Sequence, residues 1–269
     1  MSIPLLQKAN SFKKHLLITI LKVQTKGLKH KLIILILLSS SLQLNASYRS
    51  EIYSAYINNK MDLWRGVIDR MNAIPGISDE LLLELVNYQY GYIGYCLGFD
   101  KKDEARKYLC LAQRNIEILE KKEFNLSLVN SYKAAFYGFR IELNPISAPF
   151  NGFKSIDCAR AALKLDSGHY FGYIQYGNMK FNMPSALGGS KREALKYYLK
   201  AREIIEKDPE AINEDWNYMS LLIVIGQTYA SMKDYTSAEI VYKNILEIEP
   251  GFLYVKDDLY PGLLKKMKK

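Results

Sequence analysis

One segment near the C-terminus, Met219–Phe252, constrains the fold more than any other part of the chain. It contains two runs of helical periodicity, and Asp234 stands where it can cap the second run. Pro250 follows that run and ends it. Gly226 and Ala238 place small residues where two antiparallel helices would cross closely. Such a hairpin cannot bury its apolar faces alone, so the segment predicts stacking on neighbouring hairpins.

The offsets of Gly226, Tyr229, Ala238, Tyr242 and Pro250 resemble those of the tetratricopeptide repeat family. The resemblance covers this hairpin well and the preceding one in part. It implies a right-handed, TPR-like solenoid with irregular N-terminal units. It also implies a surface that holds a partner rather than a catalyst.

The rest of the chain after the leader is helical in its periodicity as well. No alternating run of strand type bounded by turn residues is present. We therefore predict an all-α fold of about five stacked antiparallel hairpins. The predicted helices are 48–58, 62–71, 80–97, 103–122, 126–143, 154–165, 169–181, 191–207, 213–232 and 234–248.

The first 46 residues differ from everything that follows. They carry seven lysines and no acidic residue, and the apolar run LIILILLSSSLQL after Lys31 precedes Ala46. This order is typical of a secretory signal peptide, and the run is shorter than the ~20 residues of a spanning helix. We predict cleavage after Ala46, a single domain over 47–269, and a periplasmic or secreted protein with no membrane insertion after cleavage. The alternative is an uncleaved N-terminal membrane anchor. A lipid anchor is not expected, because no Cys lies near the cleavage site.

The leader accounts for most of the formal charge of +9. Without its seven lysines the 37 basic residues fall to 30, against 28 acidic ones. The remaining chain is nearly neutral, so a nucleic-acid partner is not expected. Cys96, Cys110 and Cys158 are an odd set, which excludes a complete disulfide framework. All three are predicted to be small core residues, with a Cys96–Cys110 pair as the alternative.

His169 is the only histidine after the leader, which removes most catalytic templates. A zinc site would need several His and Cys ligands at short spacing, and no phosphate-binding loop or dinucleotide fingerprint is present. We therefore expect no enzymatic activity, no cofactor and no metal. His169 itself is predicted to be a turn residue at a helix start.

An insertion separates two of the predicted helices and contains Pro184, Gly188 and Gly189. From the residues alone it predicts a bend that needs positive φ, with an anion cradle as the alternative. The surrounding string resembles periplasmic repeat proteins that accompany TRAP-type transporters. That resemblance implies a soluble helical protein with a central pore or cleft that associates with solute-binding partners.

Tyrosine is the abundant aromatic residue, with 21 copies, and Tyr88, Tyr92 and Tyr95 share one helix face. Hairpin packing explains most of them, and a binding cleft is the alternative. Our leading hypothesis is a non-enzymatic exported scaffold that binds a protein or peptide. The alternative is a periplasmic carrier of an apolar small molecule, associated with a transporter. The residues least explained by packing are the candidate binding residues Tyr176, Asn178, Asn182, Asn217 and Gln227.

Overall fold

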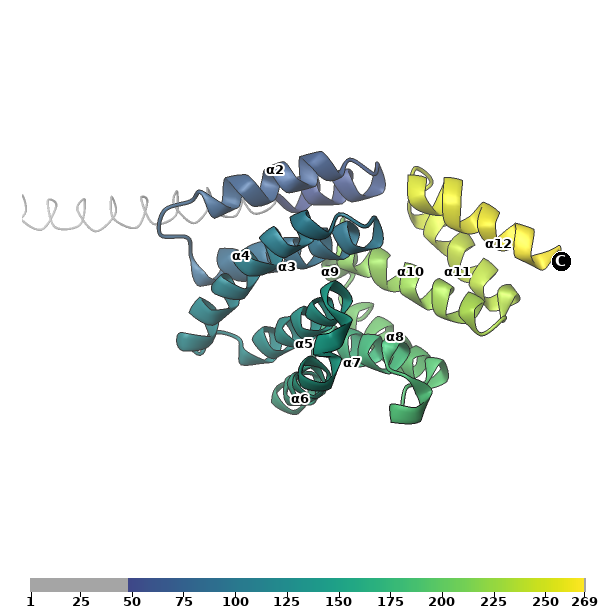
Figure 1. Ribbon diagram of the computed structural model, residues 1–269. Helices are drawn as coiled ribbons and strands as arrows, with labels where there is room; N and C mark the ends of the chain where they lie inside the picture. The colour runs from purple at the N-terminus through teal and green to yellow at the C-terminus, as the bar shows by residue number, and fades with distance from the viewer. Residues whose placement is uncertain (1–47, 269) are drawn as a thin grey trace, which may run out of the picture. The chain divides into compact units, whose positions relative to one another are not determined.

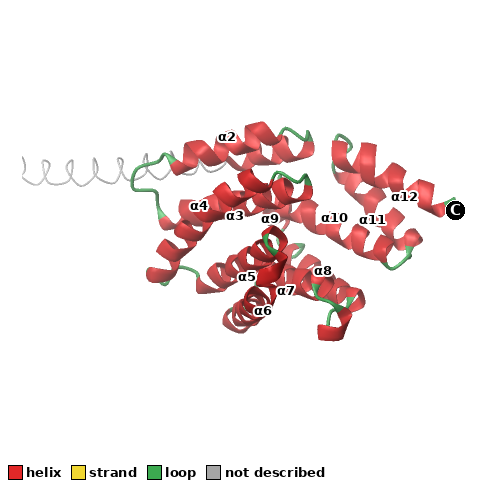
Figure 2. Ribbon diagram, in the orientation of Figure 1, coloured by secondary structure: helices red, strands yellow, loops and turns green. Residues whose placement is uncertain are grey.

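The computed structural model describes residues 48–268, and every regular element in that range is a helix (Figures 1 and 2). The all-α prediction is therefore confirmed. The predicted signal peptide and its cleavage site lie outside the described residues. From Arg49 onward the chain forms one compact unit. A first helical segment at 48–57 is followed by α2 (Met61–Asn72), α3 (Asp79–Gly98), α4 (Lys102–Lys121), α5 (Leu126–Leu143), α6 (Ala148–Leu165), α7 (Tyr170–Asn182), α8 (Lys191–Ile205), α9 (Pro209–Ile212), α10 (Trp216–Ser231), α11 (Tyr235–Ile248) and α12 (Tyr260–Met267).

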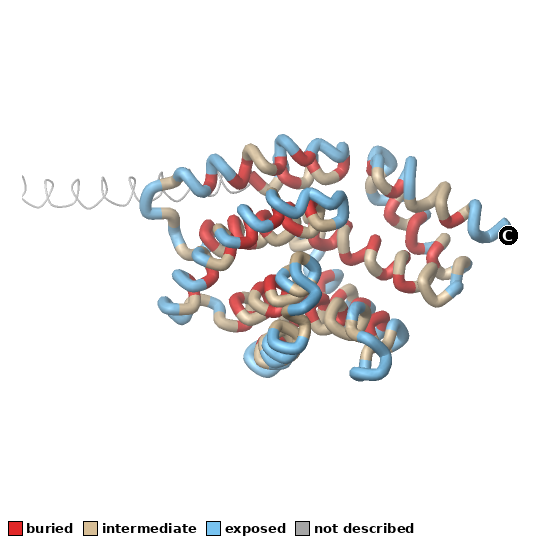
Figure 3. Tube along the Cα trace, in the orientation of Figure 1, coloured by how far each residue is buried: buried red, intermediate tan, exposed pale blue. Residues whose placement is uncertain are grey.

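Consecutive helices pack as hairpins. The most extensive contacts join α3 to α4, α5 to α6, α7 to α8 and α10 to α11. The short connections make the partners of each pair antiparallel. Between hairpins, α5 touches α3, α4 and α7, and α8 touches α10. Figure 3 shows that the buried residues lie on the faces that these helices turn toward one another.

Short polar side chains begin several of the helices. Ser190 Oγ accepts a hydrogen bond from the Glu193 N–H at 3.2 Å, and Asp234 Oδ1 accepts one from the Ser237 N–H at 3.1 Å. Each bond satisfies one of the backbone donors that a helix N-terminus leaves free. The sequence predicted the cap at Asp234, and α11 ends at Ile248 as predicted.

Glycine and tyrosine meet inside the two C-terminal hairpins. A Cβ atom at Gly226 of α10 would clash with the ring of Tyr242 on α11, and one at Gly177 of α7 would lie 2.5 Å from Tyr198 of α8. Tyr198 and Tyr242 are buried. The small residue at 226 therefore permits the close crossing that the sequence predicted.

The segment before α7 differs from its prediction. Helix α6 begins at Ala148 rather than Lys154, and a 3-10 turn occupies Pro145–Ser147. Pro149 does not prevent this earlier start, because the first turn of a helix needs no N–H from it. The later insertion agrees with its predicted bend, since Gly188 has a φ of +94°.

The prediction that all three cysteines are core residues is wrong for one of them. Cys96 is buried and Cys158 is half-buried, but Cys110 is exposed, and all three are free. Cys110 follows the buried Leu109 on α4 and so points from a different side of the helix. An apolar neighbourhood in the sequence does not by itself place a helical residue in the core.

Candidate functional site

Three glycines mark one face of helix α3. Gly91, Gly94 and Gly98 are spaced by three and four residues, so they lie along the same side of the helix. A Cβ at Gly91 would lie 2.6 Å from both Trp64 and Trp216. At Gly94 the nearest atom, on Phe139, would be 3.9 Å away, and at Gly98 nothing lies within 4 Å. The face is therefore closed at Gly91 and opens toward Gly98.

An aromatic pocket of about 300 Å³ lies over this glycine face. Its walls come from the first helical segment, α2, α3, α5, α10 and the chain that follows α11. Segments near both ends of the described chain therefore meet at one site. The volume is at the lower end of the range of about 300–1,000 Å³ for ligand pockets. The lining residues are Tyr56, Asn59, Met61, Trp64, Tyr90, Gly91, Gly94, Tyr95, Gly98, Phe99, Phe139, Trp216, Ser220, Phe252 and Tyr254.

The rings of the pocket support one another. The centroids of Trp64 and Trp216 lie 4.9 Å apart with an interplanar angle of 74°. Tyr56 lies 5.1 Å from Phe252. Trp64 is fixed further, because its Nε1 donates to the Tyr88 carbonyl at 2.9 Å. Such ring pairs each contribute about 0.5–1.5 kcal/mol beyond area burial, so the wall is built before any ligand arrives.

The hydroxyl groups of three pocket tyrosines are neutral donors. Burial raises the pKa of Tyr56, Tyr90 and Tyr254 above the ordinary value of a phenol. The Tyr90 hydroxyl accepts a hydrogen bond from Gln175 Nε2 at 3.2 Å. The pocket therefore presents apolar ring faces and uncharged hydroxyls, a surface suited to an apolar molecule with few polar atoms.

The five candidate residues from the sequence lie behind the pocket or away from it. None of them lines it. Asn178 accepts from the Tyr198 hydroxyl at 2.8 Å and also hydrogen-bonds Tyr90, a wall residue. Gln227 on α10 hydrogen-bonds Tyr254, another wall residue. These two side chains support the pocket from outside.

The other three candidates belong to separate contacts. Tyr176 packs against Tyr197 of α8, with centroids 4.6 Å apart. Asn182 ends α7 and donates to the Asn178 carbonyl at 2.9 Å. Asn217 lies on α10 and is buried, with only 5% of its surface exposed.

Neither the glycine face nor the two tryptophans were among the predicted binding residues. Of the tyrosines it singled out, Tyr95 lines the pocket, whereas Tyr88 and Tyr92 are buried in helix packing. The spacing of Gly91, Gly94 and Gly98 inside a helix was the available signal, because glycine weakens a helix interior by about 1 kcal/mol without a compensating role.

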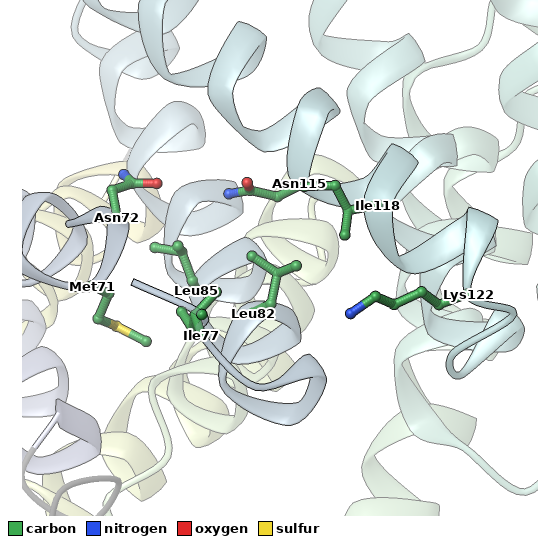
Figure 4. A pocket seen from close by; sticks show the side chains of 9 residues that line it. Met71, Asn72, Ile77, Leu82, Leu85, Asn115, Ile118 and Lys122 are labelled. Carbon is green, nitrogen blue, oxygen red and sulfur yellow. The ribbon is translucent and has the colours of Figure 1, made fainter. Parts of the chain in front are cut away.

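A second, smaller pocket of about 190 Å³ lies at the other end of α3 (Figure 4). It has aliphatic walls, and its polar groups already have partners. Lys122 Nζ lies 2.6 Å from Asp79 Oδ1, and Asn115 Nδ2 donates to the buried Gln89 at 3.1 Å. This pocket offers less area and fewer free polar groups than the aromatic one. Its lining residues are Met71, Asn72, Gly76, Ile77, Leu82, Leu85, Asn115, Ile118 and Lys122.

Residues 48–268 lack two further features. No group of three or more His, Cys, Asp or Glu side chains there is arranged to hold a metal ion. None of the helices in this range combines the length and apolar character that crossing a bilayer requires.

The chain is similar to solved structures, one of which is named below. No family model and no curated protein matches the chain. Among solved structures, the chain is similar to the HusA haemophore from Porphyromonas gingivalis, with a TM-score of 0.54 and 16% sequence identity. The superposition covers 69% of this chain and 93% of that chain. At this identity the likeness shows the fold alone.

Proposed function

We propose that this chain is a non-enzymatic binding protein that carries a flat apolar molecule in the aromatic pocket. The observation that supports the proposal is the pocket itself, in which rings from separate segments surround a glycine face on α3. Its lining contains no His, Cys, Asp or Glu. It therefore lacks the usual general bases that would activate Ser220 as a nucleophile, while it offers extensive contact area.

A porphyrin such as haem is the candidate ligand class. The structural neighbour is titled a haemophore, and a planar conjugated ring suits stacking against Trp and Tyr faces. Of the usual axial ligands of haem iron, the lining offers Met61 and tyrosines but no His or Cys, so we expect ring contacts to make the main contribution to binding. Export through the predicted leader fits a carrier of this kind. The TPR relationship and an association with a transporter remain proposals that rest on the sequence.

The chain contains its own reporter for binding. Its two tryptophans, Trp64 and Trp216, both line the pocket. We expect haem and metal-free protoporphyrin to quench tryptophan fluorescence saturably and with similar affinity. Saturable binding of neither compound would overturn the proposal.

A side chain that fills the aromatic pocket tests whether the porphyrin binds there or elsewhere on the protein. Gly94→Leu adds a side chain where the glycine face is open, so it should weaken porphyrin binding at least tenfold. Gly66→Leu is the matched control, because Gly66 lies on α2 outside the lining with only Arg70 near its Cβ position, at 3.9 Å. Equal porphyrin affinities of Gly94→Leu, Gly66→Leu and the wild type would show that the porphyrin binds outside the aromatic pocket.

We also propose a second candidate function, the binding of a partner protein. Ile146, Phe150 and Phe153 are 88%, 77% and 72% exposed on the 3-10 turn and the start of α6. Such a cluster of exposed apolar residues is typical of a contact surface. Arg140 and Lys154 beside it both lie over the Tyr137 ring, which favours an acidic partner.

Affinity capture from an extract of the source cells tests this candidate. A partner recovered with the wild type should be lost with Phe150→Ser/Phe153→Ser. It should be retained with Leu187→Ser, which alters an exposed residue on a separate loop. A set of captured proteins that is the same for all three baits would contradict the candidate.

A further inference from the structure

The rim of the aromatic pocket carries a cation. The turn between α3 and α4 passes through Asp100 at a φ of +56°, and the Lys101 N–H donates to the Cys96 carbonyl at 2.8 Å. This geometry returns the Lys101 side chain over Tyr95. Lys101 Nζ lies 4.9 Å from the centre of the Tyr95 ring and donates to the Tyr95 hydroxyl at 3.2 Å. Since Tyr95 lines the pocket, the ammonium group stands at its edge.

The acidic residues around this turn already have other partners. Asp100 pairs with Lys102 at 3.0 Å, Asp103 with Arg106 at 2.7 Å and Glu104 with Arg65 at 3.1 Å. Within residues 48–268, Lys101 forms no ion pair with a carboxylate.

The ammonium group of Lys101 keeps capacity for an incoming acceptor. An ammonium has three donors, and Tyr95 accepts from one of them. The hydrogen bond to Tyr95 also raises the pKa of Lys101, so the group stays charged at neutral pH. The Tyr95 hydroxyl accepts this bond through its oxygen, which leaves its own proton free to be donated.

Phe99 completes the rim. It is 59% exposed, and its ring lies 4.7 Å from that of Tyr95. An apolar face and a cation therefore stand side by side where the glycine face opens at Gly98. A purely apolar ligand would leave the Lys101 ammonium group without an anionic partner.

We infer that the ligand is an amphiphile whose ring system enters the pocket and whose carboxylate binds the Lys101 ammonium and the Tyr95 hydroxyl at the rim. The inference rests on the proposed function, because it assigns the polar end of the same ligand. A charge-assisted pair of this kind is stronger than a neutral hydrogen bond and fixes the orientation of the ring.

Protoporphyrin and its dimethyl ester test the inference, because they share the ring and differ in the carboxylates. The wild type should bind the acid about tenfold more tightly than the ester, which corresponds to ~1.4 kcal/mol. Lys101→Gln should abolish that preference while leaving the affinity for the ester unchanged. Tyr95→Phe keeps the ring and removes the hydroxyl, so it should reduce the preference in part.

Lys102→Gln is the matched control, since it removes the adjacent positive charge, which pairs with Asp100 and lies outside the pocket lining. It should retain the preference for the acid. Equal binding of acid and ester by the wild type, or the same loss in both lysine variants, would overturn the inference and leave the proposed function standing. Binding of neither compound would instead overturn the proposed function.

Discussion

At the scale of a single residue, His169 couples the stability of the fold to pH. It is the N-cap of α7, and its Nδ1 accepts from the Phe171 N–H at 3.2 Å. Burial lowers the pKa of His169 below its ordinary value of 6.5, although nearby Asp166 opposes the shift. As pH falls below 6.5, the unfolded chain therefore takes up the proton before the folded one does. The free energy of unfolding should decrease with falling pH in this window.

Replacing the His169 imidazole with a side chain that does not titrate isolates its contribution to the pH dependence of stability. His169→Asn supplies a side-chain acceptor for the cap but does not titrate, so its stability should fall less than that of the wild type between about pH 7 and pH 5. Urea unfolding at several pH values measures the difference. Burial raises the pKa of Glu84 and Asp215, which titrate with the opposite sign, but they are common to both proteins and cancel. Parallel pH profiles for the two proteins would show that His169 has no such role.

At the scale of the element, the sequence predicted helices best where their ends carry local signals. Helix α5 has the predicted bounds, α8 begins at the predicted residue, and α11 begins after the predicted cap at Asp234. A cap or a Pro-Gly stop acts through neighbours in the sequence, so it can be identified without knowledge of the fold. The start of α6 was missed because a proline in a first turn resembles a loop proline. The π-helical turn Tyr254–Leu259, which joins the chain after α11 to α12, has no comparable local signal.

The sequence did not predict the pocket, because the pocket depends on contacts between helices that are far apart in the sequence. Gly91 is required because Trp64 of α2 and Trp216 of α10 meet over it, and these residues are far apart in the sequence. Helical periodicity reports which face of a helix is apolar, but not which distant ring lies against it. The candidate asparagines and glutamines were chosen because they are polar on apolar helices. Two of them, Asn178 and Gln227, turn out to support wall tyrosines through hydrogen bonds.

At the scale of the whole described unit, hydrogen bonds connect its first helical segment to its last hairpin, and both of these parts line the pocket. Arg49 Nη2 donates to the Ala211 carbonyl at 2.9 Å, and its Nε donates to the Glu214 carbonyl at 3.3 Å. These acceptors lie in α9 and in the turn that leads into α10. Tyr53 donates to Glu249, just after α11, at 3.1 Å. The first helical segment is therefore tied to the last hairpin, and both contribute walls to the site.

Arg49→Gln should weaken this closure and the pocket together. Loss of the guanidinium donors should lower the free energy of unfolding by about 1–3 kcal/mol. Binding of the porphyrin probe should also weaken severalfold, because Trp216 begins α10 directly after the turn that Arg49 holds. Arg70→Gln is the control, since Arg70 pairs with Glu51 at an exposed position, where such pairs contribute at most about 1 kcal/mol. Urea unfolding and tryptophan quenching measure the two effects. If both variants lose the same stability and keep full affinity, the ends of the unit do not support the pocket, and the wall formed by α3, α5 and α10 is sufficient on its own.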